Sequence, residues 1–454
     1  MIDYSSANIT NLFFKLFFPT LLGMFSVSAV TTIDGIFVGH GVGSHGIATI
    51  NLCVPLIMLL TGFGVMVGVG GSVIASISLG KGKIIYARGT MTQALIFAVF
   101  ISSIVTLILI FFPQWVGMIL GTSTTLMPFV TDYLIYFAPS LIFELIIAIS
   151  VFALRLDGAP NFAMLSSIVT VATNAVLDYI FIFPLNMGIK GAAIATSLSC
   201  FIGALMVLYY LAFKAQKIKL ISLHSSLQGF IFFTKNIRSQ CIIGSSAFLG
   251  ETTLAVLMFV GNYTFMHYLG DNGVGAFGIC CYYLPFVFMT GNSIAQSSQP
   301  IISYNFSINN KKRVKKALNI SLKTAFCCSS IMALFFILFP EIMVNIFVNL
   351  SDPSAQIAIH GFPYIGIGFI FFVLNLAVIG YLQSIEDVKR STLIALMRGF
   401  IFLIPSFILL PQLTGEKGIW LALTFSELTV TLIILINVLR LRFIKIHHIT
   451  HQNN

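Results

Sequence analysis

Charged side chains are scarce in this sequence. Asp, Glu, Lys and Arg make up only 8% of its 454 residues, whereas a soluble globular domain carries about 25%. So few charges cannot cover a water-facing chain of this length, which excludes a soluble enzyme, a disordered chain and a coiled coil. The hydrophobic fraction of 58% and the long apolar runs leave a helical integral membrane protein.

The sequence also lacks the spacings of metal sites and disulfide frameworks. Its seven cysteines lie in apolar stretches with no CxxC pair and no Cys/His ligand spacing, and free cysteine packs as a small hydrophobe. No HExxH, DDxxD or Ser/His/Asp grouping occurs within the apolar runs. We therefore expect no cofactor, no metal ion other than Na⁺ at a coupling site, and no enzyme activity.

Twelve apolar runs are long enough to cross about 30 Å of hydrocarbon as helices. Six precede a polar stretch and six follow it, which predicts an all-α protein with an N-lobe at 1–213, a cytoplasmic linker at 214–240 and a C-lobe at 241–454. The expected spans are 12–39, 47–79, 91–112, 129–152, 161–184, 191–213, 241–268, 274–301, 318–340, 358–384, 392–411 and 418–439.

Basic residues gather in alternate loops. Of the 24 Lys and Arg residues, only Lys190 and Lys417 fall in the loops of the opposite side. Because cytoplasmic loops carry the excess of Lys and Arg, both termini of this multi-pass protein are expected on the cytoplasmic side of the plasma (inner) membrane. The net charge of +10 is then a topology signal, and no nucleic-acid partner is needed to explain it.

The two halves repeat at a constant spacing of 227 residues. Glycine, proline and other landmarks recur at this offset in the pairs Gly23 and Gly250, His40 and His267, Gly64 and Gly291, Pro113 and Pro340, Pro184 and Pro411, and Lys190 and Lys417. Each half has six spans, so both have the same orientation and should be related by a pseudo-two-fold axis along the membrane normal. Two such bundles can expose a central cleft to either side in turn, which favours a transporter over a duplicated scaffold.

Few carboxylates fall inside the expected spans. A charge near the bilayer centre costs at least about 2.5 kcal/mol on insertion scales, so each is a functional candidate. Away from the ends of the spans, these carboxylates are Asp34, Glu144, Asp178, Glu251 and Glu427. Glu144 is expected to pair with Arg155 as a structural contact, and Glu427 has no obvious partner.

The acidic residues of the first half suggest a cation site. Asn174 and Asp178 are four residues apart and therefore share one helix face, and Thr196 can add a hydroxyl. Such oxygen ligands suit H⁺ or Na⁺, and two close carboxylates titrate as a coupled pair. Asp34 and Asp178 have no acidic counterpart at the 227-residue offset, which favours a specialised site. The alternative is that the two aspartates separately cap or bond backbone in packed helices.

Four segments resemble the multidrug and toxic compound extrusion (MATE) family of transporters, and its DinF/MepA-like branch in particular. These segments are Thr31–Gly39, Asn174–Asp178, Gly188–Thr196 and Gln299–Asn305. The resemblance covers essentially the whole chain. It implies a V-shaped fold of two six-helix lobes and the export of drug-like organic cations in exchange for H⁺ or Na⁺. It also implies cation-coupling roles for Asp34, Asn174, Asp178, Thr196 and Tyr133, and a hinge in the first span at Pro19.

One feature departs from a related branch of the family. Glu251 resembles the membrane-embedded glutamate of NorM-like transporters, which pair it with an acidic residue in the tenth span. Here that span offers only Tyr364 and Asn375, so a complete C-lobe cation site is not expected. Glu251, Tyr364 and Asn375 are instead candidates to line the drug cleft.

The expected function is therefore secondary active multidrug efflux by alternating access, carried out by a monomer in the lipid bilayer and leading to drug resistance. The runner-up is a lipid-linked oligosaccharide flippase of the same superfamily, which a larger and strongly basic cleft would favour. The third hypothesis is a membrane enzyme or a receptor that does not transport. The residues leave H⁺ and Na⁺ both open, because the same oxygen cluster serves either ion.

Overall fold

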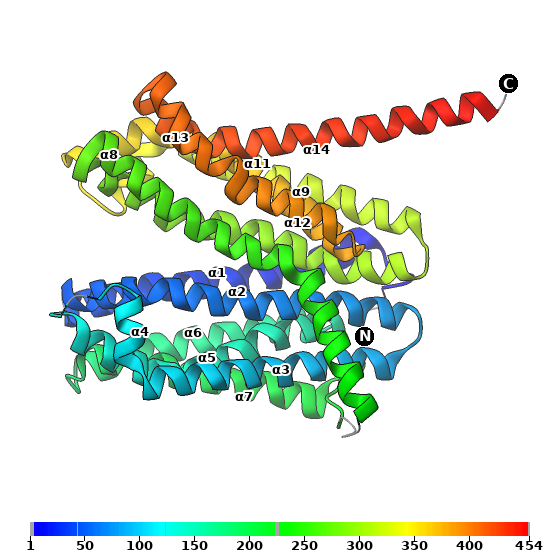
Figure 1. Cartoon of the computed structure of the whole chain (residues 1–454), viewed down its shortest axis with the longest axis horizontal. Helices are drawn as coiled ribbons and strands as arrows, with labels where there is room; N and C mark the ends of the chain where they lie inside the picture. Colours follow the sequence, from blue (N-terminus) through cyan, green and yellow to red (C-terminus); the bar gives the residue numbers. More distant parts are fainter. Residues whose placement is uncertain (1–3, 43, 123, 223–226, 453–454) are drawn as a thin grey trace. The chain divides into compact units, whose positions relative to one another are not determined.

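A computed structural model describes residues 4–42, 44–122, 124–222 and 227–452 (Figure 1). Within these residues every regular element is a helix, and twelve stretches are long and apolar enough to cross a membrane. The number of spans predicted from the sequence is thus confirmed. In chain order the helices are α1 (Ile9–Gly41), α2 (Ser44–Gly80), α3 (Ile84–Phe111), α4 (Pro113–Ile119), α5 (Met127–Asp157), α6 (Pro160–Ile182), α7 (Gly188–Tyr209), η1 (Tyr210–Lys214), α8 (Leu227–Ser307), α9 (Lys311–Leu338), α10 (Pro340–Asn345), α11 (Pro353–Ser384), α12 (Val388–Leu396), η2 (Met397–Ile401), α13 (Leu403–Thr414) and α14 (Glu416–Gln452).

Proline and glycine mark several helix ends. Pro113 and Pro340 begin the short helices α4 and α10 at equivalent positions of the two halves, because proline lacks an N–H that the first helical turn leaves unpaired anyway. Gly158, at φ 99°, ends α5. Gly270, at φ 61°, interrupts α8 between its two spans. Glycine adopts such positive φ values without a steric cost.

By packing, the chain divides into two compact units. Unit 1 contains the chain up to Thr252 together with Asn292–Ser321 and Gly380–Ser391, and unit 2 contains Thr253–Gly291, Leu322–Ile379 and the chain from Thr392. This division follows local packing, whereas the two lobes expected from the repeat follow the symmetry of the sequence. Unit 1 contains α1 to α7 and pieces of spans from the second half.

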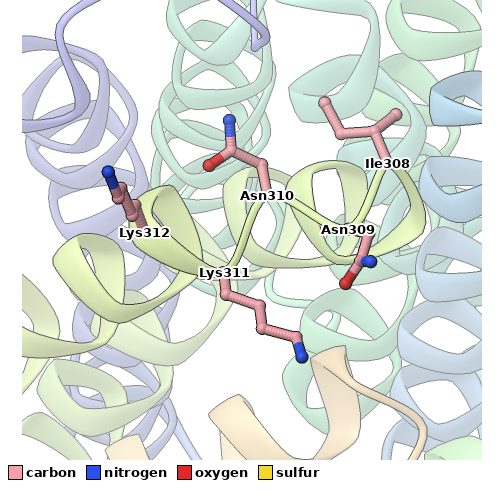
Figure 2. A pocket seen from close by; sticks show the side chains of 5 residues that line it. All are labelled: Ile308, Asn309, Asn310, Lys311 and Lys312. Atoms are coloured by element: carbon pink, nitrogen blue, oxygen red, sulfur yellow. The ribbon is translucent and has the colours of Figure 1, made fainter.

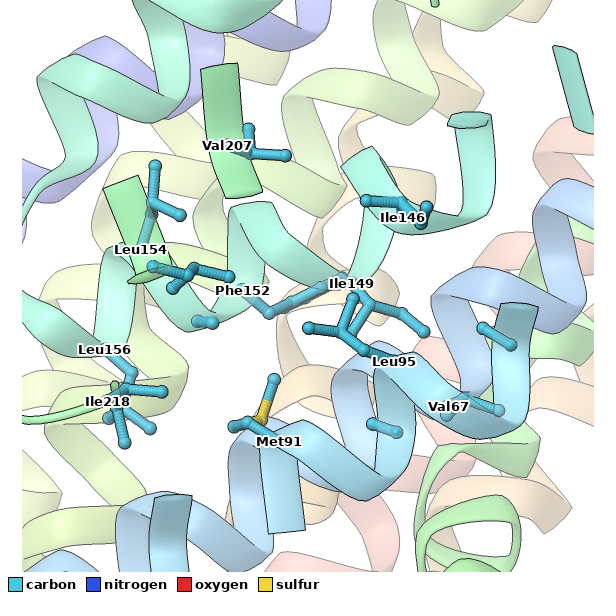
Figure 3. Close-up of a cluster of buried hydrophobic side chains, with 14 of the residues drawn as sticks. Val67, Met91, Leu95, Ile146, Ile149, Phe152, Leu154, Leu156, Val207 and Ile218 are labelled. Atoms are coloured by element: carbon cyan, nitrogen blue, oxygen red, sulfur yellow. The ribbon is translucent and has the colours of Figure 1, made fainter. Parts of the chain in front are cut away.

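The core of unit 1 lies around α5, which packs against α2, α3 and α7. Buried aliphatic and aromatic side chains from these helices fill the space between them, as Figure 3 shows for Val67, Leu95, Ile149 and Val207. Helix α6 packs against α1 and α7. Burial of these apolar faces therefore fixes α1 beside α6, and each of these two helices carries one of the predicted aspartates.

The expected pair between Glu144 and Arg155 is wrong. Arg155 Nη1 donates a hydrogen bond to Gln296 Oε1, and Glu144 Oε1 accepts one from the Thr61 hydroxyl at 2.7 Å. The two residues share a face of α5 but are 11 positions apart, which separates them by about 16 Å along the helix axis. Each therefore found its partner on a neighbouring helix.

Candidate functional site

The carboxyl groups of Asp34 and Asp178 lie close enough to interact electrostatically. Asp34 lies near the end of α1, Asp178 lies one turn before the end of α6, and Asp178 is fully buried. No Lys, Arg or His in the described part of the chain forms an ion pair with either carboxyl group. Two negative charges this close to each other repel, so one proton or one cation bound between them would relieve the repulsion.

Asn174 lies one turn before Asp178 on α6 and is 2% exposed. Neither its Nδ2 nor its Oδ1 has a hydrogen-bond partner among the described residues, and no N–H or O–H group of these residues donates to Asp34 Oδ1 or to either oxygen of Asp178. An unsatisfied buried polar group costs roughly 1–3 kcal/mol. Several of them at one point therefore indicate a place for a small polar ligand.

Tyr133 of α5 borders this acidic pair. The side chain is 5% exposed, and its ring stacks on Phe137 with centroids 5.2 Å apart. Its hydroxyl lies in the electrostatic field of three carboxyl groups, those of Asp34, Asp178 and Glu144. The hydroxyl of Tyr133 is therefore placed to respond to the charge on the pair.

Thr196 and Pro19 have less direct relations to the pair. The Thr196 hydroxyl donates to the carbonyl of Ala192 on its own helix at 3.0 Å, and its oxygen keeps lone pairs for a further donor or a cation. Pro19 lies inside α1 and removes one helix hydrogen bond there, which permits a bend.

The donor set of this site is two carboxylates and neutral oxygen atoms. Within the described residues, no group of three or more His, Cys, Asp and Glu side chains comes together. Two carboxylates with an amide oxygen are suited to one proton or one hard monovalent cation, and either would neutralise one of the two negative charges. Binding or release of such a cation changes the net charge of the site by one unit.

The three candidates for the drug cleft have different surroundings. Glu251 of α8 belongs to unit 1 and packs against α2, where a Cβ placed on Gly62 would lie 3.3 Å from the Glu251 Cβ. Tyr364 of α11 belongs to unit 2, and its backbone carbonyl accepts a hydrogen bond from Thr424 at 2.7 Å. Contact between either side chain and a cargo stays a prediction.

Asn375, the third candidate, is 1% exposed and belongs to a polar network in unit 2. Its Nδ2 donates to Glu427 Oε2 at 2.7 Å and to the Glu427 carbonyl at 3.0 Å, and its Oδ1 accepts from Thr431 at 2.9 Å. The network includes Arg398, whose Nη2 lies 2.8 Å from Glu427 Oε1. We did not expect this partner for Glu427, although a basic residue inside the span at 392–411 was a visible signal.

One surface hollow lies away from these residues. A cavity of about 530 Å³ at the turn between α8 and α9 is lined by Ile308, Asn309, Asn310, Lys311 and Lys312. The side chains of Lys311 and Lys312 point in different directions (Figure 2), and none of the predicted site residues lines the hollow.

The twelve apolar spans of the described residues, with a pair of aspartates between α1 and α6 of which Asp178 is fully buried, define a polytopic membrane transporter. A family model described as MatE matches residues 19–180 and again 247–408, which together exceed half of the chain. The chain belongs to the MATE family. Its double match agrees with the internal repeat in the sequence.

Curated relatives and solved structures agree with this assignment. The chain is 26% identical to the multidrug export protein MepA of Staphylococcus haemolyticus, over 91% of this chain and 90% of the relative. It is also 26% identical to MepA of Staphylococcus aureus strain NCTC 8325, over 90% and 89%. A MOP superfamily transporter from Pyrococcus furiosus has a similar fold, with a TM-score of 0.85, 19% identity and 94% of both chains covered. These findings indicate a multi-pass membrane transporter and not an enzyme.

Proposed function

We propose that this protein is a secondary active exporter that moves drug-like organic cations and amphipathic drugs out of the cell in exchange for H⁺ or Na⁺. The observation that carries the proposal is the pair of Asp34 and the fully buried Asp178, which has no cationic partner in the described part of the chain. The names of the relatives, multidrug export proteins, support the class of cargo.

The exchange follows from differential binding. A cation that enters from outside binds Asp34 and Asp178, where the oxygens of Asn174 and Thr196 complete its shell, and favours the state that releases the drug. A drug that enters from the cytoplasm favours the opposite state. Each ligand can shift the equilibrium only by its difference in affinity for the two states.

The remaining parts fit this cycle. The two halves, 1–213 and 241–454, act as lobes joined by the linker at 214–240, and both termini face the cytoplasm. Pro19 lets α1 bend as the cation site empties and fills. Glu251 and Tyr364 are the remaining candidates to contact the cargo, because Asn375 is held in the network of Glu427 and Thr431. The working unit is a monomer in the plasma membrane.

The test is efflux of a fluorescent organic cation, such as ethidium, from proteoliposomes with an imposed pH or Na⁺ gradient. Asp34→Asn and Asp178→Asn each remove one negative charge and keep the side-chain shape, so both variants should fold and insert but lose gradient-driven efflux. The matched control is Asp132→Asn, because Asp132 is 37% exposed and paired with Lys190. Unchanged gradient-driven efflux in both variants would show that Asp34 and Asp178 do not bind the coupling cation.

The same preparation separates the two coupling ions. Each gradient is applied alone, with the other ion equal on both sides. The ion whose gradient drives efflux in the parent, but in neither aspartate variant, is the coupling ion. Efflux that neither gradient drives would contradict the exchange mechanism.

A further inference from the structure

Unit 2 carries a buried ion pair in the middle of two apolar spans. Arg398 lies near the centre of the span Val388–Thr414, and Glu427 lies near the centre of Glu416–Asn437. Their side chains are 0% and 1% exposed. Arg398 Nε also donates to Glu427 Oε1 at 3.1 Å and to Oε2 at 3.3 Å, so one edge of the guanidinium is directed at the carboxylate.

Stability alone is a weak reason for such a pair. Two charges in the middle of spans are costly to insert, and replacing a buried ion pair with apolar side chains is often neutral or stabilising. Arg398 lies in η2, a π-helical turn, and such turns occur frequently at functional sites. These features favour a functional reason for the pair.

The ligand types around this pair are those of the predicted cation site in unit 1. There, two aspartates, Asn174 and Thr196 offer carboxylate, amide and hydroxyl oxygens. In unit 2 the carboxylate, the amide and the hydroxyl belong to Glu427, Asn375 and Thr431, which are joined by hydrogen bonds of 2.7 to 3.0 Å. Asn375 donates to Glu427, and Thr431 donates to Asn375 and to the Glu427 carbonyl, so the Glu427 carboxylate is the group that faces the cation. The two sites differ in the source of the positive charge. In unit 2 it comes from the chain itself, because the guanidinium of Arg398 lies against Glu427.

We propose that the guanidinium of Arg398 is a tethered cation that permanently occupies the cation position at the Glu427 carboxylate, which Asn375 and Thr431 hold in place. This half of the protein then has no exchangeable coupling cation, and the coupling ion binds only at Asp34 and Asp178. The second statement rests on the proposed function, whereas occupation of the site by Arg398 does not.

The arrangement is not a copy of the first half. At the 227-residue offset, Arg398 corresponds to Val171 and Glu427 to Cys200, so neither charge has a counterpart. The two halves therefore differ in how their buried carboxylates are neutralised. In the first half, Asp34 and Asp178 have no basic partner from the chain, whereas in the second half Arg398 pairs with Glu427.

The site is also shaped for a flat cation. The Cζ of Arg398 lies 4.2 Å from the centroid of the Phe372 ring, an arrangement that attracts guanidinium electrostatically. Nη1 of Arg398 is buried and has no hydrogen-bond partner among the described residues, so Glu427 is the acceptor that holds the charged group. Free guanidinium ion is therefore a suitable probe for the site once the Arg398 side chain is removed.

The experiment measures the melting temperature of purified full-length protein as guanidinium chloride is raised through the low millimolar range, with sodium chloride at equal ionic strength as reference. All variants carry Asp34→Asn and Asp178→Asn, so that the unit 1 pair cannot contribute. In this background Arg398→Ala should show a saturable rise in melting temperature with guanidinium. Arg398→Ala combined with Glu427→Gln has the same cavity without the carboxylate and should show no rise.

Two further results keep the test decisive. Arg398→Lys keeps a tethered charge and should not respond to guanidinium. If Arg398→Ala can be purified only when guanidinium is present, while the variant that also carries Glu427→Gln is recovered with or without it, the proposal is supported. An equal response with and without Glu427→Gln, or no response in a folded Arg398→Ala protein, overturns it.

A separate measurement addresses the number of exchangeable sites. Binding of the coupling ion to protein with Arg398 intact should be lost completely in Asp34→Asn/Asp178→Asn. Saturable binding that remains in this variant and disappears on addition of Glu427→Gln would show an exchangeable site in unit 2 and overturn the proposal. Binding and melting need no transport, so failure of the efflux mechanism would not be mistaken for failure of this inference.

Discussion

The hydroxyl of Tyr4 donates a 2.7 Å hydrogen bond to the backbone carbonyl of Arg155, which attaches the segment before α1 to the end of α5. The side chain of Tyr4 is 1% exposed. Arg313 secures the same segment by donating to the carbonyls of Tyr4 and Ala7 at 3.1 and 2.8 Å. Burial raises the pKa of the Tyr4 hydroxyl above its ordinary value, and the negative charge of Asp157 raises it further.

Tyr4→Phe should therefore change how stability depends on pH. The folded-state pKa of Tyr4 is above its unfolded value of about 10, so the neutral hydroxyl contributes stability that is complete below that pH and is lost as pH rises above it. At neutral pH the variant should be less stable by roughly 0.5–1.5 kcal/mol, the value of one hydrogen bond. Thermal unfolding of both proteins on raising the pH to about 11 checks this. A stability difference that stays constant over this range would contradict it.

Asp157 holds the beginning of the stretch predicted as a linker. Its Oδ1 accepts hydrogen bonds from the backbone N–H groups of Gln216, Lys217 and Ile218 at 3.0, 2.6 and 2.9 Å, and its Oδ2 accepts one from the Tyr210 hydroxyl at 2.9 Å. Hydrogen bonds to a charged group contribute roughly 1.5–3 kcal/mol each. This carboxylate therefore orders the beginning of the segment together with Ile218, whose side chain is buried in the core of unit 1.

Asp157→Ala should release that segment. We expect faster cleavage by trypsin after Lys217 and Lys219 in the folded protein, because a protease needs locally extended backbone. The control is Asp132→Ala, since the exposed pair of Asp132 and Lys190, 3.3 Å apart, is worth about 1 kcal/mol or less. Equal cleavage rates in the two variants would show that Asp157 does not order the linker.

Much of the architecture was predictable because apolar length is a local property. Each span needs about 20 apolar residues, and this requirement alone predicted the twelve spans. The approach of Asp34 to Asp178 was also within reach, since a charge in a lipid span must face the protein interior. The pairing of Asn174 with Asp178 on one face follows from the helical period alone.

Partners on different helices were not predictable in this way. Glu427 and Arg398 are 29 residues apart, and Glu144 and Thr61 are 83 apart. Their contacts depend on how each helix is rotated about its axis and how far it slides along its neighbour, which packing of the whole unit determines. The prediction of a Glu144–Arg155 pair was wrong because it assumed that two residues on the same face of one helix would be in contact.

Thr61 is the hydrogen-bond donor that the structure places on the Glu144 carboxyl group, at 2.7 Å. Thr61→Val keeps the shape of the side chain and removes the donor, so the partly buried carboxyl group of Glu144 should lose its partner at a cost of up to roughly 1–3 kcal/mol. Thr61→Ser keeps the hydroxyl and should lose less. Melting temperatures of the two variants check this order.

The reason for that order is testable in the Glu144→Gln background. There Thr61→Val should cost less, because a neutral amide is cheaper to leave unpaired than a charged carboxylate. If Thr61→Val destabilises both backgrounds equally, its effect comes from packing and not from the hydrogen bond. A double-mutant cycle over Thr61 and Glu144 isolates the pairwise contribution.

Helices α2 and α8 approach each other closely in unit 1 at two glycines. A Cβ on Gly70 would overlap the carbonyl oxygen of Gln240, and a Cβ on Gly244 would overlap that of Met66. The obstructing atoms belong to backbone and not to flexible side chains, so only movement of a whole helix can relieve the overlap. Gly70→Ala and Gly244→Ala should therefore each destabilise the protein by roughly 1–3 kcal/mol or more.

Gly278→Ala is the matched control for this prediction. Gly278 also lies inside a helical span, but a Cβ there meets nothing within 4 Å, so the variant should gain the higher helix propensity of alanine, about 1 kcal/mol. Thermal unfolding of the three single variants and of Gly70→Ala/Gly244→Ala tests the contact. Because one separation of α2 from α8 relieves both overlaps, the double variant should lose less stability than the sum of the two single losses. Strict additivity would mean that the two glycines act at independent contacts.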